Sequence, residues 1–469
     1  MTLILLGLIG GGLITYIASL NWRRAVMAAL VIVVLEGVLR KWVLPQASEV
    51  IFFLKDFVLL GAYLSFFCNS SIPKKRIPYR DTIKLLLFLF TVWALVQVFN
   101  PALGSPIIGI VGLKNYFIYV PLIWLIPALF DSEEDLYKFL RTYLLILIPV
   151  ALLAIAQFLS PPDSPLNVYA RETSFGGVAM IGDSGFVRVT GTFSYTNGYN
   201  ALISTCFALL LPLVTREQPK VWLGLAFLEL GLIGTTLFMT GSRGTAIKLI
   251  FILVSYVVVQ GIVHFRTVLR FSINLVIPTL IAVFLFTYQY NAAFEAYASR
   301  FESNSDLPNR IQDIFLQPFT FSTEQQFGGY GTGATYQANG FIRSLLDLPP
   351  GDPIYVSYEG ETGRIIIELG WFGFTLWFAF RGMILFAIWQ TYRKLQTPFL
   401  KHLALSIFFV QLISLSGGVV FQHIPSLYHW FFNGLVFLLP HLETNSLNRI
   451  SLQKAYYESN SNFPRSPNG

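Results

Sequence analysis

Apolar runs of bilayer length recur along almost the whole chain and alternate with short polar or basic loops. A helix needs about 17–25 apolar residues to cross a hydrocarbon core about 30 Å thick. The pattern therefore predicts an all-α polytopic membrane protein with about 12–13 transmembrane helices and one large extracytoplasmic loop. The expected membrane helices cover residues 3–20, 25–40, 49–67, 83–99, 107–129, 136–159, 199–214, 221–240, 245–263, 271–289, 365–390, 402–417 and 425–441.

On this pattern the chain divides into membrane helices, one large polar loop and a polar tail. The parts are residues 1–289 (ten helices, with an outer loop at about 160–198), 290–363 (the large loop), 364–442 (three helices) and 443–469 (a tail expected to be disordered). The large loop carries charges in a chain that otherwise avoids them, which indicates that the protein works at that face. The 107–129 segment contains Gly112 and Pro121 and could be broken or re-entrant.

Composition and charge narrow the function classes. Of the 469 residues, 54% are hydrophobic and 12% charged, and the mean hydropathy is +0.61. The net charge of +7 does not indicate nucleic-acid binding, because Lys and Arg gather in short loops that set membrane orientation. These loops fall on one side, which we assign to the cytoplasm together with the C-terminus; they contain Arg23–Arg24, Lys74–Arg76, Arg216, Lys220, Arg266, Arg270, Arg393–Lys394 and Lys401.

Six charged residues lie within or at the ends of expected membrane helices, in the outer halves: Glu36, Arg40, Lys41, Lys55, Asp56 and Lys114. An ionised group at the bilayer centre costs about 2.5 kcal/mol or more, so such residues usually face a bundle interior or a wet cavity. One interpretation is a structural set of ion pairs, with long basic side chains reaching the interface. The other is a polar cavity open to the outside, which the convergence of all six on one side favours.

Two motifs on the same side suit an anion. In the first, residues 188–200, Arg188 precedes a run of small and hydroxylated residues that contains Asn197 and leads into a helix. The free N–H groups of a helix start attract anions. The second motif, residues 240–244, places Arg243 between two glycines. A guanidinium binds phosphate with two parallel hydrogen bonds, so both motifs indicate a phosphate or pyrophosphate site.

At these residues the chain resembles the O-antigen ligase/O-antigen polymerase superfamily of bacterial membrane proteins. Four stretches carry the resemblance, in the family's order: residues 188–200, 241–244, the glycine run 327–333, and the loop-to-helix re-entry 361–373. The number of expected helices and the position of the large loop also fit. The resemblance covers most of the chain.

The resemblance implies metal-independent glycosyl transfer without a cofactor, at the outer face of the bacterial inner membrane. Members of this superfamily take a glycan from undecaprenyl pyrophosphate and pass it to lipid A core or to another lipid-linked unit. By matching motifs, Arg243 and Arg188 are candidates to bind the pyrophosphate, with Arg364 and Lys114 as further candidates. The expected partners are this lipid-linked glycan, the bilayer and other polysaccharide assembly or export proteins, and not nucleic acid.

The general base departs from the family pattern. Ligases place a histidine just before the re-entry helix, whereas this chain has Glu359 and Gly360 there and no histidine in the large loop. A partly buried carboxylate can serve as a base, so the candidates are Glu361, Glu359 and, in the last outer loop, His423. The other interpretation of Glu361 is that it complements the dipole of the helix that follows.

Aromatic residues in the large loop could hold sugar. Tyr330 and Tyr358 could stack on sugar rings, and Asn197 could bind the acceptor; packing of the loop on the membrane surface is the alternative. Two other functions also remain open. One is transport of a small anion such as bicarbonate along the buried charges, and the other is a non-catalytic role in polysaccharide export.

Overall fold

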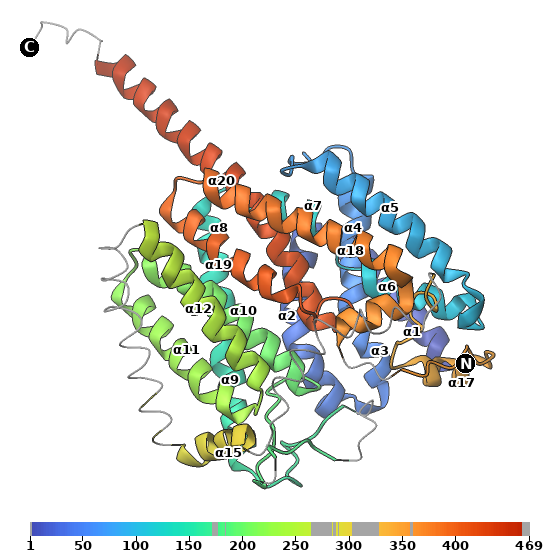
Figure 1. Cartoon of the computed structure of the whole chain (residues 1–469). Coiled ribbons are helices and arrows are strands. Elements are labelled where there is room, and N and C mark those ends of the chain that lie inside the picture. The colour runs from blue at the N-terminus through green and yellow to red at the C-terminus, as the bar shows by residue number, and fades with distance from the viewer. Residues whose placement is uncertain are drawn as a thin grey trace, which may run out of the picture.

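The computed structural model describes residues 2–170, 177–182, 184–263, 284, 288, 290–302, 328–356 and 360–461. Within these residues the protein is helical and has no strand; one isolated bridge pairs Met180 with Val187. Figure 1 shows the helices packed into one bundle, with the last helix extending away from it.

The first half of the bundle consists of α1 (Thr2–Ser19), α2 (Trp22–Val38), η1 (Leu39–Val43), η2 (Pro45–Ala47), α3 (Ser48–Phe52), α4 (Leu54–Cys68), α5 (Arg80–Val98), η3 (Pro101–Leu103), α6 (Pro106–Phe117), α7 (Leu122–Leu125), η4 (Ile126–Ala128), α8 (Glu133–Leu144) and α9 (Leu147–Leu159). The second half consists of α10 (Thr196–Thr215), α11 (Lys220–Met239), α12 (Arg243–Val263), α15 (Asn291–Glu302), α17 (Asn339–Leu346), α18 (Glu361–Lys394), α19 (Pro398–Ser414) and α20 (His423–Ser461).

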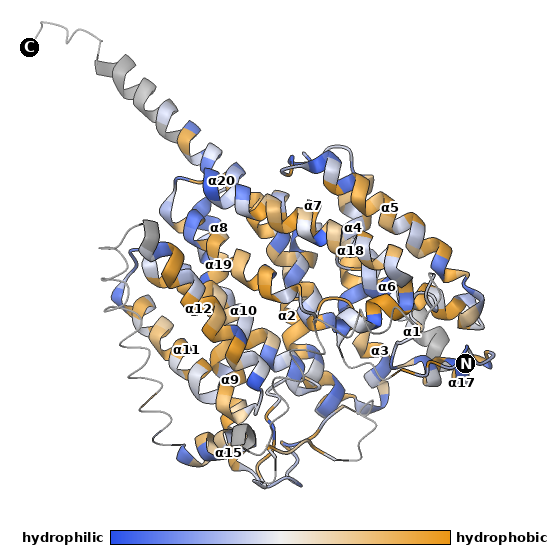
Figure 2. Cartoon of the chain, in the orientation of Figure 1, coloured by the Kyte–Doolittle hydropathy of each residue, from blue (hydrophilic) through white to orange (hydrophobic). Residues whose placement is uncertain are grey.

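Eight helical segments in the described part are long and apolar enough to cross a membrane. They are Pro45–Cys68, Arg80–Val98, Pro106–Ala128, Glu133–Leu159, Thr196–Thr215, Lys220–Met239, Arg243–Gly261 and Glu361–Lys394. Shorter apolar helices cover Ile9–Ser19 and Pro398–Ser414. In Figure 2 hydrophobic residues colour much of these helices, while hydrophilic residues gather where α20 leaves the bundle. The prediction of an all-α, multi-pass membrane protein is confirmed to this extent.

Several helices are interrupted, and the sequence explains where. The expected 107–129 helix is broken: α6 ends at Phe117, and α7 begins after Pro121, which has no N–H to donate to the Phe117 carbonyl four residues earlier and whose ring crowds that carbonyl. In α18 the backbone of Gly370 has φ of 65° and ψ of −176°, a conformation open only to glycine. The first turns of α18 therefore form a short helix that meets the longer remainder at a kink.

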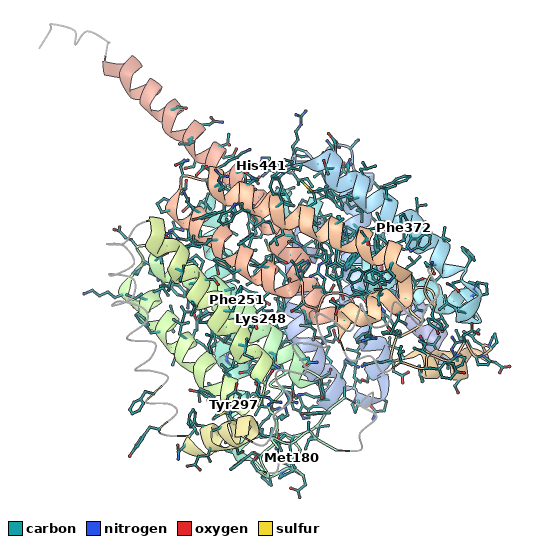
Figure 3. The ribbon with its side chains drawn as sticks, viewed as in Figure 1. Met180, Lys248, Phe251, Tyr297, Phe372 and His441 are labelled. Carbon is teal, nitrogen blue, oxygen red and sulfur yellow. The ribbon has the colours of Figure 1, made fainter. Side chains whose placement is uncertain are left out.

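The basic loops meet at one end of the bundle. Asp131 pairs with Arg23 at 3.2 Å and with Lys75 at 3.6 Å, joining three loops that are distant in sequence. His441 Nε2 lies 2.8 Å from the carbonyl oxygen of Arg76, which brings α20 to the same end. In Figure 3 His441 is far from Met180, at the opposite end of the molecule. The loops that contain Arg23 and Lys75 therefore share one end of the structure with the Asp131 segment and α20.

The C-terminal segment begins as a continuation of the last helix. Helix α20 continues past Pro440 to Ser461, so residues 443–461 are helical and 462–469 lie outside the described part. The helix is held where it leaves the bundle, because the Glu443 carboxylate accepts hydrogen bonds from the backbone N–H groups of Gln396 and Thr397 at 2.8 and 2.6 Å. A side-chain contact of this kind between remote segments is not visible in local composition.

The large loop is only partly described, since residues 303–327 and 357–359 lie outside the described part, as does most of the expected 271–289 helix. Its glycine run packs between α5, α6 and α18. The backbone N–H groups of Tyr330 and Gly331 donate to the carbonyl oxygens of Ile367 and Glu368 at 2.8 and 2.9 Å. A Cβ atom on Gly112 of α6 would lie 2.4 Å from the backbone nitrogen of Gly333, so this close approach requires glycine.

Candidate functional site

The buried charges converge, beginning with Glu36 near the end of α2. Its carboxylate pairs with Arg40, one turn further on, at 3.3 Å, and with Lys55 of α4 at 2.7 Å. All three side chains are buried. The spacing of four residues places Glu36 and Arg40 on one helix face, so that the two side chains can meet.

Asp56 forms the second part of the cluster. One carboxylate oxygen lies 2.6 Å from Lys114 Nζ of α6, and the other accepts a hydrogen bond from the Tyr119 hydroxyl at 2.7 Å. Because Asp56 directly follows Lys55, both ion pairs are fixed by one turn of α4. Lys114, predicted as a pyrophosphate ligand, is thus a member of the buried charge cluster.

Phe52 is the aromatic centre of the cluster. The charged groups of Arg40, Lys55 and Lys114 lie 5.0, 4.6 and 5.2 Å from its ring centroid, within the range of cation–π attraction. The His423 ring packs edge-on against the same ring, with centroids 4.7 Å apart. His423 is buried, and among the described residues neither of its ring nitrogens has a hydrogen-bond partner.

The cluster carries more positive than negative charge. Its four cations outnumber its two carboxylates, which leaves a formal surplus of two positive charges; the members are Glu36, Arg40, Lys41, Lys55, Asp56 and Lys114. Desolvated charge is costly unless it is neutralised, so such a set favours an anion as its complement.

The loop at residues 188–195 docks on this cluster. Lys41 Nζ donates to Thr190 Oγ1 at 3.0 Å and to the Gly191 carbonyl oxygen at 2.8 Å. Arg40 donates to Ser194 Oγ at 3.1 Å. The first anion motif therefore lies directly on the buried charges, although nothing in their sequence separation indicated it.

The second anion motif meets the first. Arg188 Nε donates to the carbonyl oxygen of Thr240 at 2.8 Å, and the N–H of Val189 donates to the Met239 carbonyl oxygen at 3.2 Å. The chain then turns through Gly241, whose φ is 62°, and α12 begins at the largely buried Arg243. The two arginine motifs thus come together at one end of the bundle.

Glu361 has a well-defined structural role. Its carboxylate accepts hydrogen bonds from the backbone N–H groups of Val419, at 2.8 and 3.0 Å, and Val420, at 2.9 Å. The Phe421 N–H lies 3.5 Å from the same carboxylate. Glu361 thereby fixes the loop that leads to His423, and both of its oxygens are engaged.

Arg364 and the glycine-run loop hold each other. Arg364 donates to the hydroxyl and carbonyl oxygens of Thr335 at 3.1 and 2.7 Å, and its guanidinium lies 3.7 Å from the Phe421 ring centroid. Glu368, one turn further on, accepts from the Thr335 N–H and hydroxyl at 3.0 and 2.7 Å and from the Tyr116 hydroxyl at 2.9 Å. This network joins the large loop to α6 and α18.

The remaining predicted residues contribute less. Tyr330 is partly buried against Ile366 and Ile367 of α18, which fits loop packing. Asn197 lies exposed in the first turn of α10. Tyr358 and Glu359 lie outside the described residues.

Sequence reasoning missed several polar and aromatic members of the site. Tyr116, Tyr119 and Phe52 each contact a charged group, yet in sequence they resemble the many other aromatic residues of apolar helices. Gln157 of α9 orders the docked loop, because its side-chain oxygen accepts from the N–H groups of Thr190 and Gly191 at 3.0 and 2.8 Å. The only sequence feature that pointed to Gln157 was a polar amide inside an apolar run, and this feature does not show which residues the amide contacts.

Comparison with known proteins assigns neither a family nor a function to this chain. No protein-family model matches the chain, and no curated protein matches it. Within the described residues, no group of three or more His, Cys, Asp or Glu side chains is arranged to hold a metal ion.

Proposed function

We propose that this protein transfers or polymerises a glycan carried by undecaprenyl pyrophosphate, at the outer face of a bacterial inner membrane. The observation that carries the proposal is the buried cluster with its surplus of positive charge, on which the 188–195 loop docks while Arg188 contacts the turn before Arg243. A pyrophosphate supplies the negative charge that such a site favours, and arginine binds it with paired hydrogen bonds.

The topology that this function needs has about 12–13 membrane helices, a large loop at 290–363 outside the cytoplasm, and a cytoplasmic C-terminus. Its support is the separation of the loops into two ends. The basic loops share one end through the ion pairs of Asp131. At the other, Arg40 joins the 39–49 and 160–198 loops, and the Asp352 N–H joins the large loop to Ala102 at 2.8 Å.

In the proposed reaction a hydroxyl oxygen of the acceptor attacks the anomeric carbon of the donor sugar. The bond from that carbon to the pyrophosphate oxygen breaks, and undecaprenyl pyrophosphate leaves with the bonding electrons. A general base takes the hydroxyl proton. Of the two predicted bases that the structure describes, His423 fits better, because its ring nitrogens have no partner among the described residues whereas both Glu361 oxygens are engaged. In this proposal Arg188, Arg243 and Lys114 stabilise the charge on the leaving group.

The test is reconstitution in proteoliposomes with the host's lipid-linked glycan, followed by gel analysis of products. A ladder of multiples that remains on polyprenyl pyrophosphate identifies a polymerase, and a single transfer to a second acceptor identifies a ligase. Arg243→Ala should abolish either product. Arg393→Ala is the matched control, because Arg393 is exposed near the end of α18 and distant in the fold from the cluster.

Anion transport is the second candidate, because the six charges of the cluster would also suit a path for bicarbonate. If verified lipid substrate gives no new glycan, the same proteoliposomes should be tested for uptake of labelled bicarbonate. Glycan synthesis in cells that is unchanged by both Arg243→Ala and Glu361→Ala would instead support a non-catalytic role in polysaccharide export.

A further inference from the structure

A second feature lies at the basic end of the bundle, away from the charge cluster. A cavity of about 510 Å³ is bounded by the end of α4, the following loop, α5, and the chain around Pro121 and Trp124. Its size is typical of small-molecule and cofactor sites. None of the residues proposed to act on the glycan lines it.

One face of α5 forms a wall of the cavity. Arg80, Lys84, Leu87, Phe88 and Thr91 all line it, and their spacing of three or four residues places them on a single helix face. The wall is basic in the first two turns and largely apolar in the next two. From residue 80 to 88 the helix rises about 12 Å, which is comparable to the step from the headgroup level into the acyl region.

The basic part of the cavity has an excess of positive charge. Lys74, Arg80 and Lys84 are exposed and line the cavity, and no acidic residue lines it among the described residues. The nearby Asp81 lines an adjoining cavity instead. In the part of the chain that the structure describes, neither Arg80 nor Lys84 lies in an ion pair.

Lys75 also lines the cavity, and the pKa of its ammonium group responds to burial there. Burial lowers its pKa, although Asp131, 3.6 Å away, acts in the opposite direction. A second anion in the cavity would favour the charged form of Lys75 as Asp131 does.

The apolar part of the cavity faces the bilayer. Phe67 and Phe88, which line it, are 42% and 62% exposed, and the adjoining Leu85 and Leu89 of α5 are 56% and 42% exposed. Large apolar side chains exposed on a membrane helix contact lipid tails. A ligand can therefore enter from the bilayer and keep its apolar portion there.

We propose that this cavity binds one anionic glycerophospholipid, with its phosphate at Lys74, Arg80 and Lys84 and its acyl chains along Phe67 and Phe88. Basic pockets between membrane helices on the cytoplasmic side suit such headgroups, and the basic loops at this end assign it to that leaflet. A free phosphate would use the cations but not the apolar wall. The proposal does not depend on the glycan reaction.

The experiment is a titration of the purified protein in mixed micelles with phosphatidylglycerol or phosphatidylcholine of the same chain length, with bound lipid counted by native mass spectrometry. We expect one phosphatidylglycerol to bind more tightly than phosphatidylcholine. A basic residue near a membrane surface contributes roughly fivefold, so Arg80→Gln/Lys84→Gln should weaken phosphatidylglycerol binding by about thirtyfold. The matched control is Arg393→Gln/Lys394→Gln, which removes the same charges from exposed residues that do not line the cavity.

A charge-preserving variant separates the cavity from general surface attraction. Thr91→Phe fills the apolar part of the cavity and should also weaken phosphatidylglycerol binding. This variant tests the proposal independently if Arg80→Gln/Lys84→Gln does not fold. Equal loss in both double variants, or no preference for phosphatidylglycerol, would overturn the proposal. Displacement of the lipid by millimolar inorganic phosphate would likewise overturn it, in favour of a free-phosphate site.

Discussion

Gly37 of α2 offers a direct test of the docking of the 188–195 loop on the buried charges. A Cβ atom on Gly37 would lie 2.1 Å from the Thr192 carbonyl oxygen and 2.6 Å from both the Phe193 carbonyl carbon and the Ser194 nitrogen. All three are backbone atoms, so no side-chain rotation relieves the clash. In Gly37→Ala the loop must therefore move away from α2.

The size of the effect follows from three contributions. Alanine stabilises a helix interior by about 1 kcal/mol relative to glycine. Overpacking a close contact costs about 1–3 kcal/mol. Displacing the loop also strains the hydrogen bonds from Lys41 and Arg40, and a hydrogen bond to a charged group contributes about 1.5–3 kcal/mol. We expect Gly37→Ala to lower the free energy of unfolding by about 2–4 kcal/mol and to impair glycan transfer.

Gly382→Ala is the matched control, because Gly382 is exposed inside α18 and its added Cβ would meet no heavy atom within 4 Å. It should be neutral or slightly stabilising. Both variants and the wild type are unfolded by detergent titration in mixed micelles and assayed for transfer. If Gly37→Ala is as stable and active as Gly382→Ala, the close packing of α2 on the loop is refuted, and the site assembled from it is refuted as well.

Three further predictions concern other contacts. Arg141→Met should cost about 3–5 kcal/mol, because it strands the buried Glu229 carboxylate that Arg141 binds at 2.7 and 2.8 Å, whereas Arg141→Met/Glu229→Leu should recover most of that loss in detergent unfolding. Glu361→Gln should loosen residues 417–421, measured as faster amide hydrogen exchange there, and unchanged exchange would exclude the anchoring role. His423→Gln should slow transfer by about a hundredfold or more while donor binding persists, and a smaller effect would remove His423 as the base.

The fold was predictable as far as it depends on local hydrophobicity. Runs of apolar residues gave the long helices, and Pro121 indicated the break in the 107–129 segment. The kink at Gly370 was not predicted, because glycine is common in membrane helices and its unusual φ depends on the packing of the glycine run against α18. Local composition also gives no sign of the hydrogen bonds by which Glu443 holds α20 to the segment before α19.

The site was predictable in its members but not in its contacts. Charges such as Lys55 and Asp56 stand out because the bilayer penalises them, so the sequence alone identifies them. Their partners come from segments up to 154 residues away, as in the hydrogen bond from Arg40 to Ser194, and no periodicity encodes such a pairing. The role of Glu361 was open for the same reason, since the loop that it binds follows 58–60 residues later.

The Arg141–Glu229 pair gives an internal comparison for the charge cluster. Both side chains are buried and joined by two short hydrogen bonds, and their formal charges cancel. Such a pair satisfies itself and suits a purely structural role. The charge cluster does not balance: its cations outnumber its carboxylates by two, and His423 adds ring nitrogens without a described partner. Because buried ion pairs contribute little net stability, stability alone does not account for this unbalanced set, and the anion that we propose to bind there would balance its charge.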